Sequence, residues 1–153
     1  MSDARTACVR TGLIFFALVS AALGLYVLIS PEGFFSWSWV NLGMDYNPHL
    51  MLDYGAMNLA AAIPLGAAAV VMSPAFTRTA LASYATWSTA HFLIHVHFRS
   101  HTVAHASAAE ANLLLGVLGI GVVVPIALLL LTFGRPALPG RRRESGRRDP
   151  RVR

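Results

Sequence analysis

Residues 13–29 read LIFFALVSAALGLYVLI, an apolar run without a single charged side chain. A helix rises about 1.5 Å per residue, so this run is just long enough to cross the hydrocarbon layer of a bilayer, which is about 30 Å thick. Arg5 and Arg10 precede the run, and small residues such as Ser20 and Ala21 lie inside it. These features predict a first membrane-spanning helix and also fit a secretory signal peptide.

The composition of the whole chain agrees with a membrane protein. Its 153 residues are 56% hydrophobic and only 12% charged, which is too apolar for an ordinary soluble domain. Cys8 is the single cysteine. A disulfide framework, a CxxC redox pair and a thiolate metal cluster are therefore excluded, and the lipid bilayer is the expected surrounding.

Residues 1–133 are predicted to be all-α and to form an antiparallel four-helix transmembrane bundle. Asn47 and Pro48 mark the start of the second helix, because asparagine is a good N-cap and proline suits the first helical position. Pro64 should kink this helix, and Ser73-Pro74 ends it. The predicted spans are residues 12–29, 48–72, 79–98 and 108–133.

An aromatic segment, residues 31–47, separates the first two spans and includes Phe34, Phe35, Trp37 and Trp39. Aromatic rings with a polar edge concentrate at the membrane interface, so we expect a loop or short helix in the headgroup region. A lid packed over the bundle is an equally good interpretation. A substrate-binding aromatic box is the third.

The arginines predict the orientation in the cell membrane. Eight of the twelve lie in residues 134–153, and with four spans Arg5, Arg10 and Arg78 fall on the same side, leaving Arg99 alone on the other. The positive-inside rule then makes both termini of this multi-pass protein cytoplasmic. We expect residues 134–153 to be a disordered, Arg-rich cytoplasmic tail beside anionic lipid, and no nucleic acid partner.

Two pairs of polar residues, one His/Asp and one His/His, fall at the same predicted depth, near the extracytoplasmic end. His49 and Asp53 are four residues apart, as are His91 and His95, so each pair occupies one helix face. Glu110, near the start of the fourth predicted span, lies at a similar predicted depth. Ionisable groups at this depth avoid lipid and turn toward each other or toward water.

These five side chains suggest a site for one divalent transition metal, either zinc, iron, copper or manganese. His49, Asp53, His91, His95 and Glu110 are the predicted ligands, because imidazole and carboxylate groups suit these ions. Such a centre would activate water or oxygen. Without a metal, Asp53 with His91 or His95 would be the catalytic group, a proton-transfer couple.

A third interpretation is a structural hydrogen-bond network across the helices. A single HxxxH spacing is a weak signal by itself, and it lacks the glutamate of HExxH zinc proteases. His97 faces away from His91 and His95, while His101 and His105 fall in a predicted polar linker, residues 99–107. We interpret these last three histidines as surface residues or as a loose metal-collecting tail.

The residues Tyr46-Asn47-Pro48-His49-Leu50, with Asp53, Gly55, Ala56, His91 and His95, resemble a family of small four-helix bacterial membrane proteins near the broad DoxX-like group. The similarity spans about residues 25–97. That pattern has a proline before the first histidine of the later pair and a third histidine three residues after the second, where this chain has Ala90 and Phe98. The resemblance implies a four-helix membrane fold and no particular reaction.

Two functions follow as hypotheses. The first is a membrane protein whose His/Asp site acts on a lipid-soluble, hydrophobic small molecule, as an oxidoreductase or hydrolase. The second is a non-catalytic membrane subunit. Its fourth helix carries Gly116, Gly119 and Gly121, which would let a membrane protein partner or a second copy of the chain approach closely.

Overall fold

The computed structural model describes residues 3–133, and within them every regular element is a helix. The prediction of an all-α fold is confirmed. The predicted tail, residues 134–153, lies outside the described residues. The helices are α1 (Asp3–Ile29), α2 (Pro31–Phe35), α3 (Ser38–Asn41), α4 (Pro48–Val71), α5 (Pro74–His97), α6 (Arg99–His105) and α7 (Ala108–Leu131).

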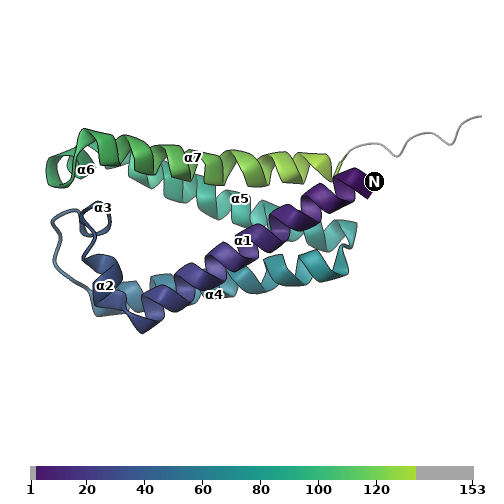
Figure 1. The fold of residues 1–153 in the computed structure, drawn as a ribbon, viewed down its shortest axis with the longest axis horizontal. Coiled ribbons are helices and arrows are strands. Elements are labelled where there is room, and N and C mark those ends of the chain that lie inside the picture. The colour runs from purple at the N-terminus through teal and green to yellow at the C-terminus, as the bar shows by residue number, and fades with distance from the viewer. Residues whose placement is uncertain (1–2, 134–153) are drawn as a thin grey trace, which may run out of the picture.

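Four of these helices are long, and consecutive long helices run in opposite directions along the molecule (Figure 1). Of them, α1, α4 and α7 are long and apolar enough to cross a membrane. α5 has 24 residues, as α4 does, but it carries many serine, threonine and histidine side chains. Three candidate spans are therefore found among residues 3–133, and the fourth predicted span stays a prediction.

The starts of the later helices follow the sequence signals. The side chain of Asn47 accepts a hydrogen bond from the Leu50 amide at 3.1 Å, and Pro48 occupies the first turn of α4. Ser73 and Ser107 cap α5 and α7 in the same way. A capping oxygen satisfies one of the amide groups that a helix start leaves unpaired, so the predicted start of the second long helix is confirmed.

The segments at residues 31–47 and 99–107 both contain short helices, which agrees with one of the two expectations for the aromatic segment and differs from the polar linker expected at residues 99–107. The aromatic segment forms α2 and α3, and the expected linker at residues 99–107 forms α6. His101 Nε2 lies 2.8 Å from the carbonyl oxygen of Leu42, and the ring of His105 occupies the space where a Cβ of Gly43 would be. Leu42 and Gly43 both have positive φ. α6 is thus held against the turn at Leu42 and Gly43, and its residues His101 and His105 make this contact.

The helices pack as two pairs, α1 with α4 and α5 with α7. The first pair crosses closely at Gly24 and Gly55, since a Cβ on Gly24 would lie 2.8 Å from the carbonyl oxygen of Gly55. Small residues allow such an approach of two membrane helices. No atom lies within 4 Å of a Cβ built at Gly116 or Gly121, so no described helix packs closely on either, and the expected approach of a partner or a second copy stays a prediction.

The two pairs are joined at only one end. The main core lies in the half of the molecule that holds the start of α1, and it draws on all four long helices. Its buried members are Val9, Leu13, Phe16, Leu65, Ala68, Ala69, Ala80, Leu81, Tyr84 and Leu128. At the opposite end, which we call the α6 end, the buried cluster contains Val27, Phe34 and Met51 and omits α5 and α7. The pairs therefore separate toward the α6 end (Figure 1).

Arg78 strengthens the joined end. Its guanidinium donates to the carbonyl oxygen of Thr132 at 2.8 Å and to the Thr132 hydroxyl at 3.2 Å, and it lies 4.3 Å from the ring centroid of Phe133. A cation at the C-terminal end of a helix satisfies unpaired carbonyl groups and interacts favourably with the helix dipole. α5 and α7 are thus tied together beside the main core.

Gly24→Ala tests the helix crossing. We expect the free energy of unfolding to fall by about 1–2 kcal/mol, because overpacking costs about 1–3 kcal/mol and better helix propensity returns part of it. SDS titration in mixed micelles, followed by circular dichroism, measures the change. Gly116→Ala is the matched control and should be neutral or stabilising. Equal effects of the two substitutions would contradict the proposed role of Gly24.

Candidate binding cavity

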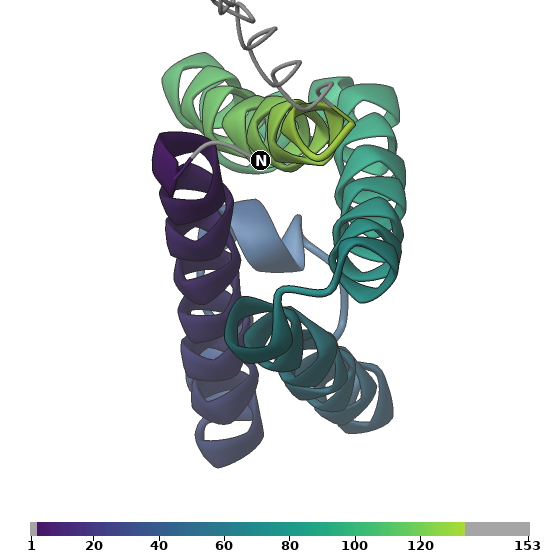
Figure 2. The same cartoon turned by 90° about the vertical axis from the view of Figure 1, so that its right-hand side faces the viewer.

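A cavity of about 660 Å³ lies at the α6 end, where the two helix pairs separate. Seen along the molecule, the long helices surround this central region and the segment of α2 and α3 crosses its far end (Figure 2). Side chains from α1 through α5 and from α7 line the cavity. They are Leu23, Phe34, Trp37, Trp39, Val40, Leu50, Met51, Tyr54, His91, Ile94, His95, Glu110, Leu113, Leu114, Val117 and Leu118.

The floor of the cavity is built from α5. The ring of His91 stacks on Trp87 with centroids 5.2 Å apart and planes 7° apart. Trp87 in turn contacts Tyr84, which belongs to the main core. Residues four apart lie one above the other on a helix, so the spacing of Trp87, His91 and His95 produces this arrangement. Trp87 thus supports the His91 ring from the side of the main core without itself lining the cavity.

The aromatic segment forms one wall of the cavity. Phe34 stacks on Tyr54 of α4 with centroids 5.9 Å apart, and Tyr54 faces His91 at 6.2 Å. Beyond Phe34, the ring of Trp37 lies 4.9 Å from that of Trp39. The rings thus continue from α5 across α4 to α3. This placement matches the interpretation of the segment as a lid packed over the bundle.

His91 and His95 both line the cavity, and their rings meet edge to face with centroids 4.8 Å apart. His95 Nδ1 is buried and has no hydrogen-bond partner among the described residues. A buried polar atom without a partner costs stability, so it calls for an explanation. His95 therefore supplies unused hydrogen-bonding capacity in a cavity whose walls are mostly apolar.

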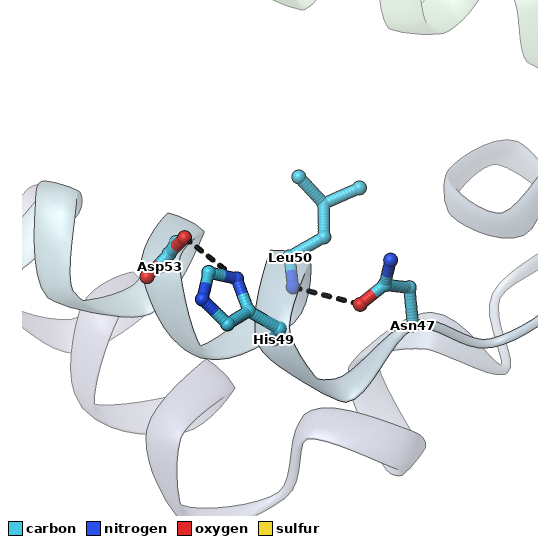
Figure 3. A network of polar contacts seen from close by, with 4 residues as sticks. All are labelled: Asn47, His49, Leu50 and Asp53. Carbon is cyan, nitrogen blue, oxygen red and sulfur yellow. Dashed lines mark hydrogen bonds and ion pairs between the residues drawn. The ribbon is translucent and has the colours of Figure 1, made fainter.

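His49 and Asp53 form a separate pair on the surface of α4 (Figure 3). His49 Nδ1 lies 3.0 Å from Asp53 Oδ2, and the two side chains are 85% and 67% exposed. Neither residue lines the cavity. Leu50 and Tyr54 face the cavity from α4 instead, since each residue turns the helix by about 100°. The order of the predicted spans indicated that His49 and Asp53 lie at one end of the molecule, but the sequence did not show how α4 is rotated.

Glu110 does line the cavity, but its carboxylate also serves the start of α7. Glu110 Oε2 accepts a hydrogen bond from the Ser107 hydroxyl at 2.7 Å, and the Ser107 oxygen accepts from the Glu110 amide at 3.1 Å. This reciprocal pair is a variant of the capping box. Asn112, two residues further, accepts a hydrogen bond from Arg99 at 2.9 Å.

The structure thus divides the five predicted metal ligands. Across residues 3–133, no group of three or more His, Cys, Asp or Glu side chains has the geometry to hold a metal ion. His49 and Asp53 form the surface pair, whereas the other three predicted ligands, His91, His95 and Glu110, line the cavity. Asp53, predicted to exchange a proton with His91 or His95, is paired with His49. A divalent metal on the two cavity imidazoles would need water or an outside ligand to complete its coordination, and such binding stays a prediction.

Sequence reasoning missed the part that Tyr54 plays. It stacks between Phe34 and His91, which makes it the link between the aromatic wall and the floor. Its position one residue after Asp53 drew attention to the carboxylate instead. The available signal was the spacing of Leu50 and Tyr54, which places two large side chains on one face of the helix.

Comparisons of the chain with protein-family models, with curated proteins and with solved structures find no match. The resemblance to the DoxX-like group therefore stays an expectation that rests on the motif residues alone.

The metal hypothesis predicts about one divalent metal per purified chain, lost in the double variant His91→Ala, His95→Ala. Elemental analysis of the protein measures the metal content. His97→Ala is the matched control, because this histidine lies on α5 and does not line the cavity. A metal-free wild-type protein, purified without chelators and supplied with zinc or iron, would contradict the hypothesis.

Proposed function

We propose that this chain is a multi-pass protein of the cell membrane that binds a lipid-soluble small molecule in the cavity at its α6 end. In this proposal α1, α4, α5 and α7 all span the bilayer, antiparallel, and both termini are cytoplasmic. The observation that carries it is a cavity of about 660 Å³ with apolar walls and a few polar groups. Sites for small molecules commonly have this size and composition.

The position of the opening supports entry from the bilayer. Leu113 and Val117 of α7 line the cavity and are 69% and 58% exposed. Leu50 of α4 and Ile94 of α5 are likewise both lining and exposed. Apolar side chains that border an opening favour contact with acyl chains over contact with water. A ligand dissolved in the membrane could therefore enter between the two helix pairs.

The polar content of α5 is compatible with a fourth span. Thr79, Thr86 and Ser88 each donate their hydroxyl hydrogen to a backbone carbonyl of the same helix at 2.9–3.1 Å. Such bonds satisfy hydroxyl groups without water. His91 and His95 face the cavity, which spares them full contact with lipid. These features support counting α5 among the spans.

The cavity favours a ligand-binding role over the structural network. Among the described residues no hydrogen bond joins Asp53, His91 or His95 to another helix. A network that holds helices together needs such bonds. In the proposed function, His91 and His95 instead offer a polar contact to the ligand, and the non-catalytic subunit remains a hypothesis about further partners.

A cavity-filling substitution tests ligand binding. Leu114→Trp should weaken binding of the neutral probe N-phenyl-1-naphthylamine by about tenfold, because the larger ring takes up space that the probe would occupy. Fluorescence of the probe, excited in its own absorption band, measures binding to the protein in detergent. Val123→Trp is the matched control, since Val123 is exposed on the same helix and does not line the cavity.

Probe binding that is equal in the wild type and in both variants would place the probe outside the cavity and contradict the proposal. Loss of binding in both variants, with unchanged circular dichroism, would do the same, because the effect would then not depend on the cavity.

Cys8 tests the orientation. It is exposed in the first turns of α1, so a membrane-impermeant maleimide should label it only after the cytoplasmic side is made accessible. In a Cys8→Ser background, Ser100→Cys on α6 should be labelled from outside intact cells. The reverse labelling pattern would contradict cytoplasmic termini. Labelling of both positions from the same side would contradict the proposal that α1, α4 and α5 all cross the membrane between them.

A further inference from the structure

The charge that faces the cavity has one sign. Glu110 supplies the only carboxylate among the described residues that line it, and no arginine is among them. The sequence has no lysine. Arg99, at the same end of the molecule, binds Asn112, and Arg78 binds Thr132 at the opposite end. An anionic ligand would therefore find no fixed positive partner in the cavity, whereas a cation would find a negative one.

The carboxylate of Glu110 keeps capacity for a ligand. Its Oε2 accepts one hydrogen bond, from Ser107, whereas an ionised carboxylate offers about four acceptor positions. Within residues 3–133, no basic side chain forms an ion pair with it, and the one ion pair found is that of His49 with Asp53. The capping contact therefore orients Glu110 without neutralising it.

Aromatic rings share the cavity with this carboxylate. Trp37 and Trp39 line it with their rings 4.9 Å apart, and α3, which contains Trp39, packs against α7 at the end where α7 begins (Figure 1). Glu110 lies in the first turn of α7. The face of an indole ring attracts cations more strongly than that of any other aromatic side chain, and quaternary ammonium ligands are recognised in this way.

We propose that the cavity selects lipophilic organic cations, with the cationic group held beside Glu110 and the indole rings of Trp37 and Trp39. This ligand class rests on the proposed binding function. The apolar side chains of Leu114, Val117 and the other α7 residues in the wall would hold the apolar body of the ligand. A volume of about 660 Å³ is much larger than a metal ion or a simple ammonium ion needs, so a bulky amphiphilic cation fits best.

Two ions of nearly equal size and shape test the selection, tetraphenylphosphonium and tetraphenylborate. Their binding to the full chain in detergent is measured by equilibrium dialysis at pH 8, above the ordinary imidazole pKa of about 6.5. The bound amount of each ion is compared between a variant and the wild type, because partition of that ion into the detergent micelles is the same in both samples. We expect Glu110→Gln to weaken tetraphenylphosphonium binding about fivefold or more, since it removes the charge. Tetraphenylborate binding should be unchanged or tighter.

The design includes a matched control and a second variant. Glu32→Gln makes the same chemical change on α2, at the same end, on an exposed residue that does not line the cavity, and it should leave both ions unaffected. Glutamine can still serve in a capping box, so Glu110→Gln should remain folded. Trp39→Leu should weaken the phosphonium more than the borate, because it removes a ring face and no net charge.

The outcomes separate the two proposals. If the neutral probe binds and Glu110→Gln changes neither ion, or if tetraphenylborate depends on Glu110 as tetraphenylphosphonium does, cation selection is wrong and the binding function stands. If neither ion nor the neutral probe binds, the binding function itself fails. An equal effect of Glu32→Gln on the phosphonium would assign the preference to surface charge and would also overturn cation selection.

Discussion

The close crossing of α1 and α4 is the contact on which the rest of the structure depends. Where Gly24 faces the carbonyl oxygen of Gly55, the two backbones leave no space for a side chain. α5 and α7 pack against this pair through the main core, and Tyr54 of α4 also stacks on His91 of α5. Because that core occupies one half of the molecule, the other half opens into the cavity. The close packing of α1 on α4 and the cavity at the α6 end therefore lie in the same fold, one within a helix pair and the other between the two pairs.

The cavity explains how polar residues are accommodated in so apolar a chain. Imidazole or carboxylate groups facing lipid would be costly. His91 and His95 are half-buried and line the cavity, and Glu110 borders the cavity from the exposed first turn of α7. Trp87 covers His91 from below, and Tyr54 faces it from α4. His91 is held in position by stacking and Glu110 by its contact with Ser107, and both keep hydrogen-bonding capacity for a ligand.

The short helices have a structural part as well. α2 and α3 bring the aromatic wall over the cavity, and α6 contacts the turn that follows α3 through His101 and His105. Two histidines that look like part of a metal-binding run therefore serve to hold the wall in place. The histidine-rich stretch of the sequence contains two groups with different roles, one facing the cavity and one outside it.

The sequence by itself determined the all-α class, the caps that start the long helices and the apolar character of α1, because hydropathy and capping are local properties. It also placed His91, His95 and Glu110 at one end. Only the tertiary structure decided that His49 and Asp53 lie outside the cavity, that α6 is a helix, and that the closely packed glycines are those of α1 and α4. The physical reason is that each of these depends on helix rotation and on which surfaces meet, and a period of 3.6 residues shows which side chains share a face without showing what that face contacts.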